Sequence, residues 1–159
     1  MMSTDAKTPA THSTQNAFVS YSHKDSYWLD ELKKHLDPFL PELRLELWDD
    51  TRIKTGNRWQ KEIEKALESA NLAILLVSHE FLASRFIKTA ELPTLLQRAN
   101  TERLKIIWLA VGASAYDETP IMDFQCANEP TEPLASLPTK AEQNEALVKI
   151  CKKIKGLVQ

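Results

Sequence analysis

Three hydroxyl side chains stand together near the start of the sequence, at Ser20, Tyr21 and Ser22, directly after the apolar run 17–19. A buried strand that ends in such residues places them at the carboxyl edge of a sheet, where open α/β folds bind ligands. There they can hydrogen-bond a sugar or a phosphate. Ser20 and Ser22 can equally cap the turn that follows, and the sequence leaves both interpretations open.

Carboxylates follow two later apolar runs. Asp49 and Asp50 come after the alternating segment 43–48, and Glu91 lies beyond the apolar run 72–77. The two aspartates suit the capping and shaping of a polar loop more than they suit chemistry. Most glutamates are solvated acids on a helix face, and spacing alone favours that interpretation of Glu91. Trp48 and Trp59 either flank a cleft or belong to the core, which is the more common place for tryptophan.

Composition excludes several function classes. The chain has 159 residues, with 20 basic and 22 acidic side chains and a formal net charge of -2. Because no basic stripe is present, we expect no direct nucleic-acid binding. No apolar run is long enough to span a bilayer, and the polar start lacks the apolar core of a signal peptide, so we expect a cytosolic protein. The two cysteines fit that compartment as reduced thiols, with Cys151 packed in a helix stripe.

The sequence predicts neither a metal site nor a resident cofactor. The four histidines lack the paired spacing of metal ligands, and neither cysteine adds to a cluster. With three glycines and no phosphate-cradling glycine loop, the sequence argues against conventional dinucleotide binding.

Strand and helix patterns alternate along the chain. Right-handed crossovers should therefore give a flavodoxin-like α/β fold, a parallel sheet of about five strands with helices on both faces. We expect a disordered tail at 1–15 and one folded domain at 16–159. Pro38 and Pro41 are expected to end the first helix, and Pro93 to interrupt the helix between the third and fourth strands. The expected strands are 16–20, 43–50, 72–78, 105–112 and a short edge strand at 124–127.

Four segments in order resemble the successive boxes of a Toll/interleukin-1 receptor (TIR) domain, particularly the bacterial type. They are 17–22, 47–50 leading to Gly56, 74–78, and 90–93. The resemblance extends over roughly 16–158 and rests on the conjunction of the boxes.

The resemblance implies a domain that cleaves NAD+ at the nicotinamide-ribose bond, with NAD+ as substrate. By position, Glu91 is the implied catalytic residue. A single carboxylate facing the developing oxocarbenium ion suffices, because nicotinamide leaves as a neutral ring. The implied substrate-binding residues are Ser20, Tyr21, Ser22, Asp49, Ser84 and Phe86. Many family members carry an aromatic residue four positions before the glutamate; here Ile87 stands there, and Phe86 one step earlier either walls the nicotinamide pocket or packs in the core.

The family also self-associates, in some cases into filaments. The implied assembly loop contains Arg52, Ile53, Lys54 and Gly56. The alternative is that the charged side chains of this loop are ordinary solvated groups with no role in assembly. We expect Ile53 at its tip to gain from burial between copies, so that activity rises on assembly.

Two function classes follow from these observations. One is an NAD+ glycohydrolase or cyclase in bacterial antiphage defence or immune-type signalling, activated by self-association. The other is a non-catalytic module that recruits further TIR domains. The presence of Glu91 within a matching box favours the enzyme. A response-regulator receiver shares the fold class, but its phosphorylatable aspartate is missing where the third strand ends in Ser78. The sequence leaves open the trigger and any sensor domain or subunit.

Overall fold

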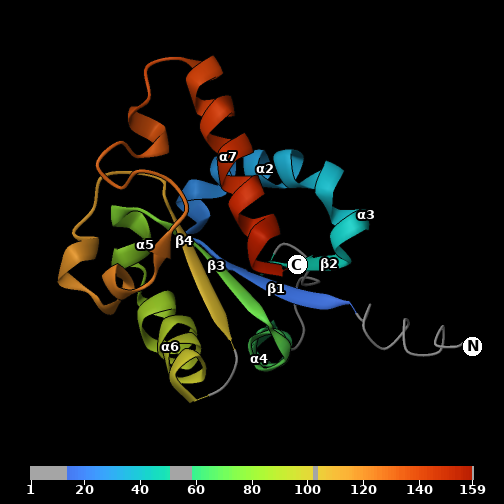
Figure 1. Ribbon diagram of the computed structural model, residues 1–159. Helices are drawn as coiled ribbons and strands as arrows, with labels where there is room; N and C mark the ends of the chain where they lie inside the picture. Colours follow the sequence, from blue (N-terminus) through green and yellow to red (C-terminus); the bar gives the residue numbers. More distant parts are fainter. Residues whose placement is uncertain (1–13, 51–58, 102–103, 159) are drawn as a thin grey trace, which may run out of the picture.

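A computed structural model describes residues 14–50, 59–101 and 104–158 of the chain. Within them lies one five-stranded parallel sheet in the order β2-β1-β3-β4-β5 (Figure 1). This is the flavodoxin-like order, with the chain reversing its direction of winding at β1 and β3. The predicted fold class is confirmed. The strands are β1 (Gln15–Ser20), β2 (Leu45–Trp48), β3 (Leu72–Val77), β4 (Lys105–Ala110) and β5 (Gln125–Cys126).

Alternate residues of each strand enter different cores. Val19 and Ile74 pack with α2 (Ser26–Leu36) and α7 (Lys140–Val158), whereas Phe18 and Leu75 pack on the opposite face. That second face is covered by α4 (Trp59–Ser69), α5 (His79–Ala83) and α6 (Leu92–Thr101). Because successive strand residues point to opposite faces, a central strand such as β3 is buried along its whole length.

The segment between α2 and β2 differs from its prediction. Pro38 and Pro41 do not end the helical path: each lies near the start of a short helix, η2 (Asp37–Phe39) and α3 (Leu40–Leu43). There the missing proline N–H costs little, because the first N–H groups of a helix have no intrahelical partner. The path ends at Arg44, whose φ of 52° lies in the left-handed region. Leu43 therefore belongs to a helix, and β2 begins two residues later than expected.

The predicted interruption at Pro93 takes an unusual form. Helical backbone resumes at Arg85, passes through a π-helical turn at Ile87–Glu91 and continues as α6. Pro93 lies just inside α6, directly after the turn. The turn places Glu91 at the junction of the two helical forms.

Two further predictions are confirmed at the carboxyl end. The short β5 pairs with β4 at the sheet edge. Thr139 caps α7 as expected: its Oγ1 accepts the Glu142 N–H at 3.1 Å and donates to the Glu142 carboxylate at 2.9 Å.

The predicted tail at 1–15 lies almost wholly outside the described residues. Within the described parts of the chain, no helix is long and apolar enough to cross a membrane.

Candidate active site

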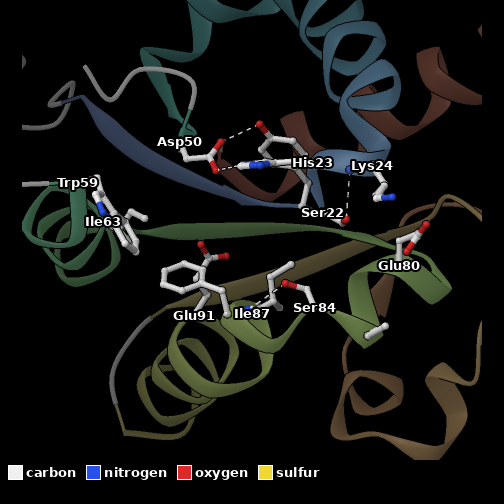
Figure 2. A pocket seen from close by; sticks show the side chains of 13 residues that line it. Ser22, His23, Lys24, Asp50, Trp59, Ile63, Glu80, Ser84, Ile87 and Glu91 are labelled. Atoms are coloured by element: carbon white, nitrogen blue, oxygen red, sulfur yellow. Dashed lines mark hydrogen bonds and ion pairs between the residues drawn. The ribbon is translucent and has the colours of Figure 1, made fainter. Parts of the chain in front are cut away.

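A pocket of about 690 Å³ opens at the carboxyl ends of β1 and β2. Its upper wall in Figure 2 carries Ser22, His23, Lys24 and Asp50, and its lower wall comes from α5 and the π-helical turn. The first residues of α4 close one side. This volume lies within the range that holds nucleotide-sized ligands, and the position matches the site of ligand binding in open parallel sheets.

Glu91 lies at the base of this pocket and points toward the strand ends (Figure 2). It is only 6% exposed, so it is buried rather than a solvated helix-face acid. Ser20 Oγ, at the end of β1, donates a hydrogen bond of 2.6 Å to Glu91 Oε1. Burial raises the pKa of Glu91 to about 7, against the lowering effect of the Ser20 hydrogen bond, and the Asp50 charge adds a smaller increase.

Asp50 faces Glu91 across the pocket and is held by two neighbours. The Tyr21 hydroxyl donates to Asp50 Oδ1 at 2.7 Å, and His23 Nε2 contacts Asp50 Oδ2. Burial, with the hydrogen bond to Asp50 and its charge, raises the pKa of Tyr21, so this phenol stays protonated and acts as a donor. The acid at the mouth of the pocket is therefore fixed by first-loop side chains.

The serines of the first loop have different roles. Ser20, expected to bind substrate, is 1% exposed and is not among the described residues that line the pocket; its hydroxyl donates to Glu91 instead. Ser22 caps the 3-10 turn η1 (His23–Asp25) by accepting the Lys24 N–H at 3.2 Å. Ser22 nevertheless lines the pocket. The exposed Lys24 beside it supplies an ammonium group that suits a phosphate.

Two aromatic rings meet at the side of the pocket. Trp59, the first residue of α4, and Phe86 have ring centroids 5.5 Å apart at 60°. Trp59 is 49% exposed, and Phe86 is half-buried just before the π-helical turn. Both line the pocket, together with Ser84 and the buried Ile87. Trp48 instead stacks on Phe18 in the core, with centroids 5.2 Å apart.

The expectation for Asp49 is not met. Among the described residues, those that line the pocket include Asp50 but not Asp49. Asp49 is 1% exposed, and its Oδ2 lies 2.8 Å from Lys33 Nζ of α2. Both acids follow the end of β2 at Trp48, where Asp49 turns toward α2 and Asp50 toward the pocket. The sequence pattern of two adjacent aspartates did not indicate which of them faces the pocket.

Sequence reasoning missed several lining residues, notably His23, Lys24, Asp50 and Ile63. His23 and Lys24 follow the hydroxyl run directly, so their place in the first loop was an available signal. For Ile63, the sequence gave no signal of a site, because its place in an apolar helix stripe predicts a core residue. The predicted assembly loop, with Arg52, Ile53, Lys54 and Gly56, lies outside the described residues.

Among the described residues, no group of three or more histidine, cysteine or acidic side chains is placed to hold a metal ion. Cys126 and Cys151 are free thiols, and burial raises the pKa of Cys151 to about 12. That thiol is packed among apolar residues, as predicted from its helix stripe.

A family model described as "TIR domain" matches residues 17–138, about three quarters of the chain. The chain therefore belongs to the TIR domain family. The match covers the sheet except for the first two residues of β1, Gln15 and Asn16, and it covers every described residue that lines the pocket.

Two individual proteins are similar to this chain. One, from Sinorhizobium fredii (strain NBRC 101917 / NGR234) and named "Uncharacterized protein y4lF", is 24% identical over 140 residues. The alignment covers 88% of this chain but only 42% of that protein. The other is the TIR domains of the activated Roq1 resistosome that directly recognizes the pathogen effector XopQ, at 16% identity and a TM-score of 0.48. It covers 87% of this chain and 84% of the other.

Proposed function

We propose that this domain is an NAD+ glycohydrolase that cleaves the bond between nicotinamide and ribose. The observation that carries the proposal is Glu91, a buried carboxylate at the base of a nucleotide-sized pocket. A structural acid at such a depth would ordinarily be paired with a cation. Among the contacts described for Glu91, the only hydrogen bond is that from the Ser20 hydroxyl. A second carboxylate oxygen thus remains for a ligand.

The chemistry requires little beyond this carboxylate. As the glycosidic bond breaks, the bonding pair leaves with nicotinamide, which becomes neutral, and positive charge develops on the ribose. Ionised Glu91 stabilises that charge and accepts hydrogen bonds from ribose hydroxyls. Water then attacks the anomeric carbon, giving ADP-ribose and a proton. Attack by the adenine ring instead of water would give a cyclic product.

The opposite wall suits the phosphates of the same substrate. Lys24 supplies a positive charge and Ser22 a hydroxyl, both at the carboxyl end of β1. Asp50 lies on the same wall as Ser22 and Lys24 and faces Glu91, where it can accept from a ribose hydroxyl. A dinucleotide could therefore span the pocket without the glycine-rich loop that resident cofactors require.

A non-catalytic TIR module is the second candidate, favoured by the Ser20–Glu91 hydrogen bond itself. This contact ties the end of β1 to the π-helical turn across 71 positions of sequence. A glutamate that served only this purpose would also be buried and hydrogen-bonded. The two candidate functions predict different effects of removing the Glu91 carboxylate on NAD+ cleavage and on the stability of the fold.

The wider setting is also a proposal. We expect the domain to act in the cytosol in antiphage defence or immune-type signalling, and to gain activity when copies assemble with each other or with a sensor. Its specific activity should then rise with protein concentration. A specific activity that stays constant across the whole concentration range would contradict assembly-gated catalysis.

The test compares nicotinamide release from NAD+ by the wild-type protein and by Glu91→Gln at high protein concentration. Removal of the carboxylate charge should lower turnover by about a thousandfold, the size expected for the main electrostatic group of a site. Glu80→Gln is the matched control, because Glu80 lines the same pocket from α5. It should retain turnover within about threefold.

Two results would contradict the proposal. One is a folded Glu91→Gln protein with wild-type turnover. The other is a wild-type protein that releases no nicotinamide at any concentration while it still associates with itself, which would favour the interaction module.

A further inference from the structure

His23 and Asp50 form an imidazole–carboxylate pair on the wall of the pocket that faces Glu91 (Figure 2). His23 Nε2 contacts Asp50 Oδ2, and the Tyr21 hydroxyl donates to Asp50 Oδ1 at 2.7 Å. Tyr21 is only 7% exposed, so a core residue anchors the carboxylate that holds the imidazole. The pair therefore has a fixed place in the pocket.

The contact with Asp50 determines what the other ring nitrogen of His23 can do. A neutral imidazole that donates from Nε2 to a carboxylate carries a free electron pair on Nδ1. Among the interactions described for His23, none involves Nδ1. The His23 side chain is 76% exposed, so water reaches the ring. An imidazole that a carboxylate orients in this way can take a proton from an attacking hydroxyl group.

Cleavage of NAD+ needs such a base only after the bond to nicotinamide has broken. Nicotinamide leaves as a neutral ring, and a nucleophile must then capture the ribose cation. Capture by water forms a C–O bond and requires the loss of a proton from the oxygen. Capture by a ring nitrogen, whether of adenine or of an added pyridine, requires no such loss. A base beside the ribose therefore favours water over nitrogen nucleophiles.

We propose that His23 is the base that takes the proton from the attacking water, and that Asp50 is the positioning residue that orients it. The inference rests on the proposed function and specifies how its product is selected. As the water oxygen bonds to the anomeric carbon, one O–H bond breaks and the proton passes to His23 Nδ1. The imidazolium that forms is paired with the Asp50 carboxylate, and the exposed ring then releases the proton to solvent. Glu91 acts from the opposite wall.

The variant His23→Gln tests the base. Its amide can still donate to Asp50 from the place of Nε2, but it has no nitrogen that accepts a proton. The assay supplies NAD+ with saturating 3-acetylpyridine and measures ADP-ribose and the acetylpyridine dinucleotide together. The ratio of ADP-ribose to this exchange product should fall by about a hundredfold, the lower end of what a positioned base contributes. Nicotinamide release should stay within about threefold of wild type, because the pyridine captures the ribose instead.

Asp50→Asn tests the orientation of the imidazole. The new amide can donate to Nε2 and thereby leave the proton on Nδ1, which is the wrong tautomer for a base at that nitrogen. The same product ratio should fall by about tenfold or more. Capture by added methanol, which also loses a proton, should fall together with capture by water in both variants. A mere change in the shape of the pocket would not single out the hydroxyl nucleophiles.

His79→Gln is the matched control. The His79 side chain is also 76% exposed and lies 4.0 Å from a carboxylate, that of Glu80, but His79 is not among the described residues that line the pocket. Its product ratio should equal that of wild type. A fall in His79→Gln as large as that in His23→Gln would overturn the role of His23.

Failure of this inference differs from failure of the proposed function. If His23→Gln cleaves NAD+ with a product ratio within about twofold of wild type, His23 is not the base, and the proposed function stands. If the wild-type protein releases no nicotinamide at any concentration, the proposed function is refuted and the role of His23 with it.

Discussion

Glu31 and Glu91 are both nearly covered, at 7% and 6% exposure, yet they lie in opposite electrostatic environments. Glu31 of α2 accepts from Lys140 at 2.7 Å and from Lys34 at 3.3 Å, which joins α2 to the start of α7. These hydrogen bonds, led by Lys140, lower the pKa of Glu31. Burial instead raises the pKa of Glu91 to about 7. Burial alone thus does not set the two acids apart; among the described residues, Glu31 accepts from two lysines, whereas Glu91 accepts from the Ser20 hydroxyl.

The two environments have opposite consequences for stability. A raised pKa means that folded Glu91 binds its proton more tightly than the unfolded chain, whose glutamate titrates near 4.5. Between pH 4.5 and 7 the folded state therefore holds more protons, and its stability falls as the pH rises. Glu31, with a lowered pKa, adds stability at neutral pH that is lost as the pH falls below about 4.5.

The largest stability effect should come from Glu91→Gln. The neutral amide removes the cost of ionising a buried acid, which is on the order of 3 kcal/mol above pH 7 for a shift of this size. The variant should be more stable than wild type at pH 8 and should lose that advantage at pH 5. Denaturant unfolding at both pH values measures it. An advantage of equal size at pH 5 and pH 8 would show that the Glu91 ionisation is not its source.

The next effect concerns Ser20→Ala. The Ser20 hydroxyl lowers the pKa of Glu91, so its loss should raise that pKa further, by about one unit. The ionised fraction of Glu91, and with it kcat/KM, should then fall more at pH 7 than at pH 8.5. We expect about a fivefold drop in kcat/KM at pH 7 that is largely recovered at the higher pH. Ser22→Ala serves as the control in the same loop and should show no such recovery. Equal losses at both pH values would mean that Ser20 acts on the substrate rather than on Glu91.

The smallest effect should come from Glu31→Gln. Its lysine partners are largely exposed to solvent, which screens the ion pairs, so the loss at pH 7 should be only about 1 kcal/mol. NAD+ turnover should not change, because Glu31 lies on the opposite face of the sheet from the Glu91 helix. Denaturant unfolding and an activity assay on one sample give both values. A loss of NAD+ turnover without a loss of stability would contradict the assignment of a structural role to Glu31 and a catalytic role to Glu91.

Sequence patterns were sufficient for the fold but not for the pocket. The apolar runs of β3 and β4 and the capping box at Thr139 depend on neighbours in sequence, and they were predictable for that reason. Whether Asp49 or Asp50 faces the pocket depends on how the backbone turns after β2 ends at Trp48, which two adjacent acids do not reveal. Likewise, the π-helical turn before Pro93 depends on a single extra residue in a helix, and a helical pattern with a proline is consistent with a simple break.

The pH profile of nicotinamide release by the wild-type protein tests the central claim most directly. If ionised Glu91 does the chemistry, kcat/KM should rise by about tenfold per pH unit below pH 7 and level off by about pH 8, with one ionisation near 7. The ionised form is the active one, so activity must rise with pH and not fall. A profile that is flat from about pH 5.5 to 8.5, or one that declines, would contradict a catalytic role for this buried carboxylate.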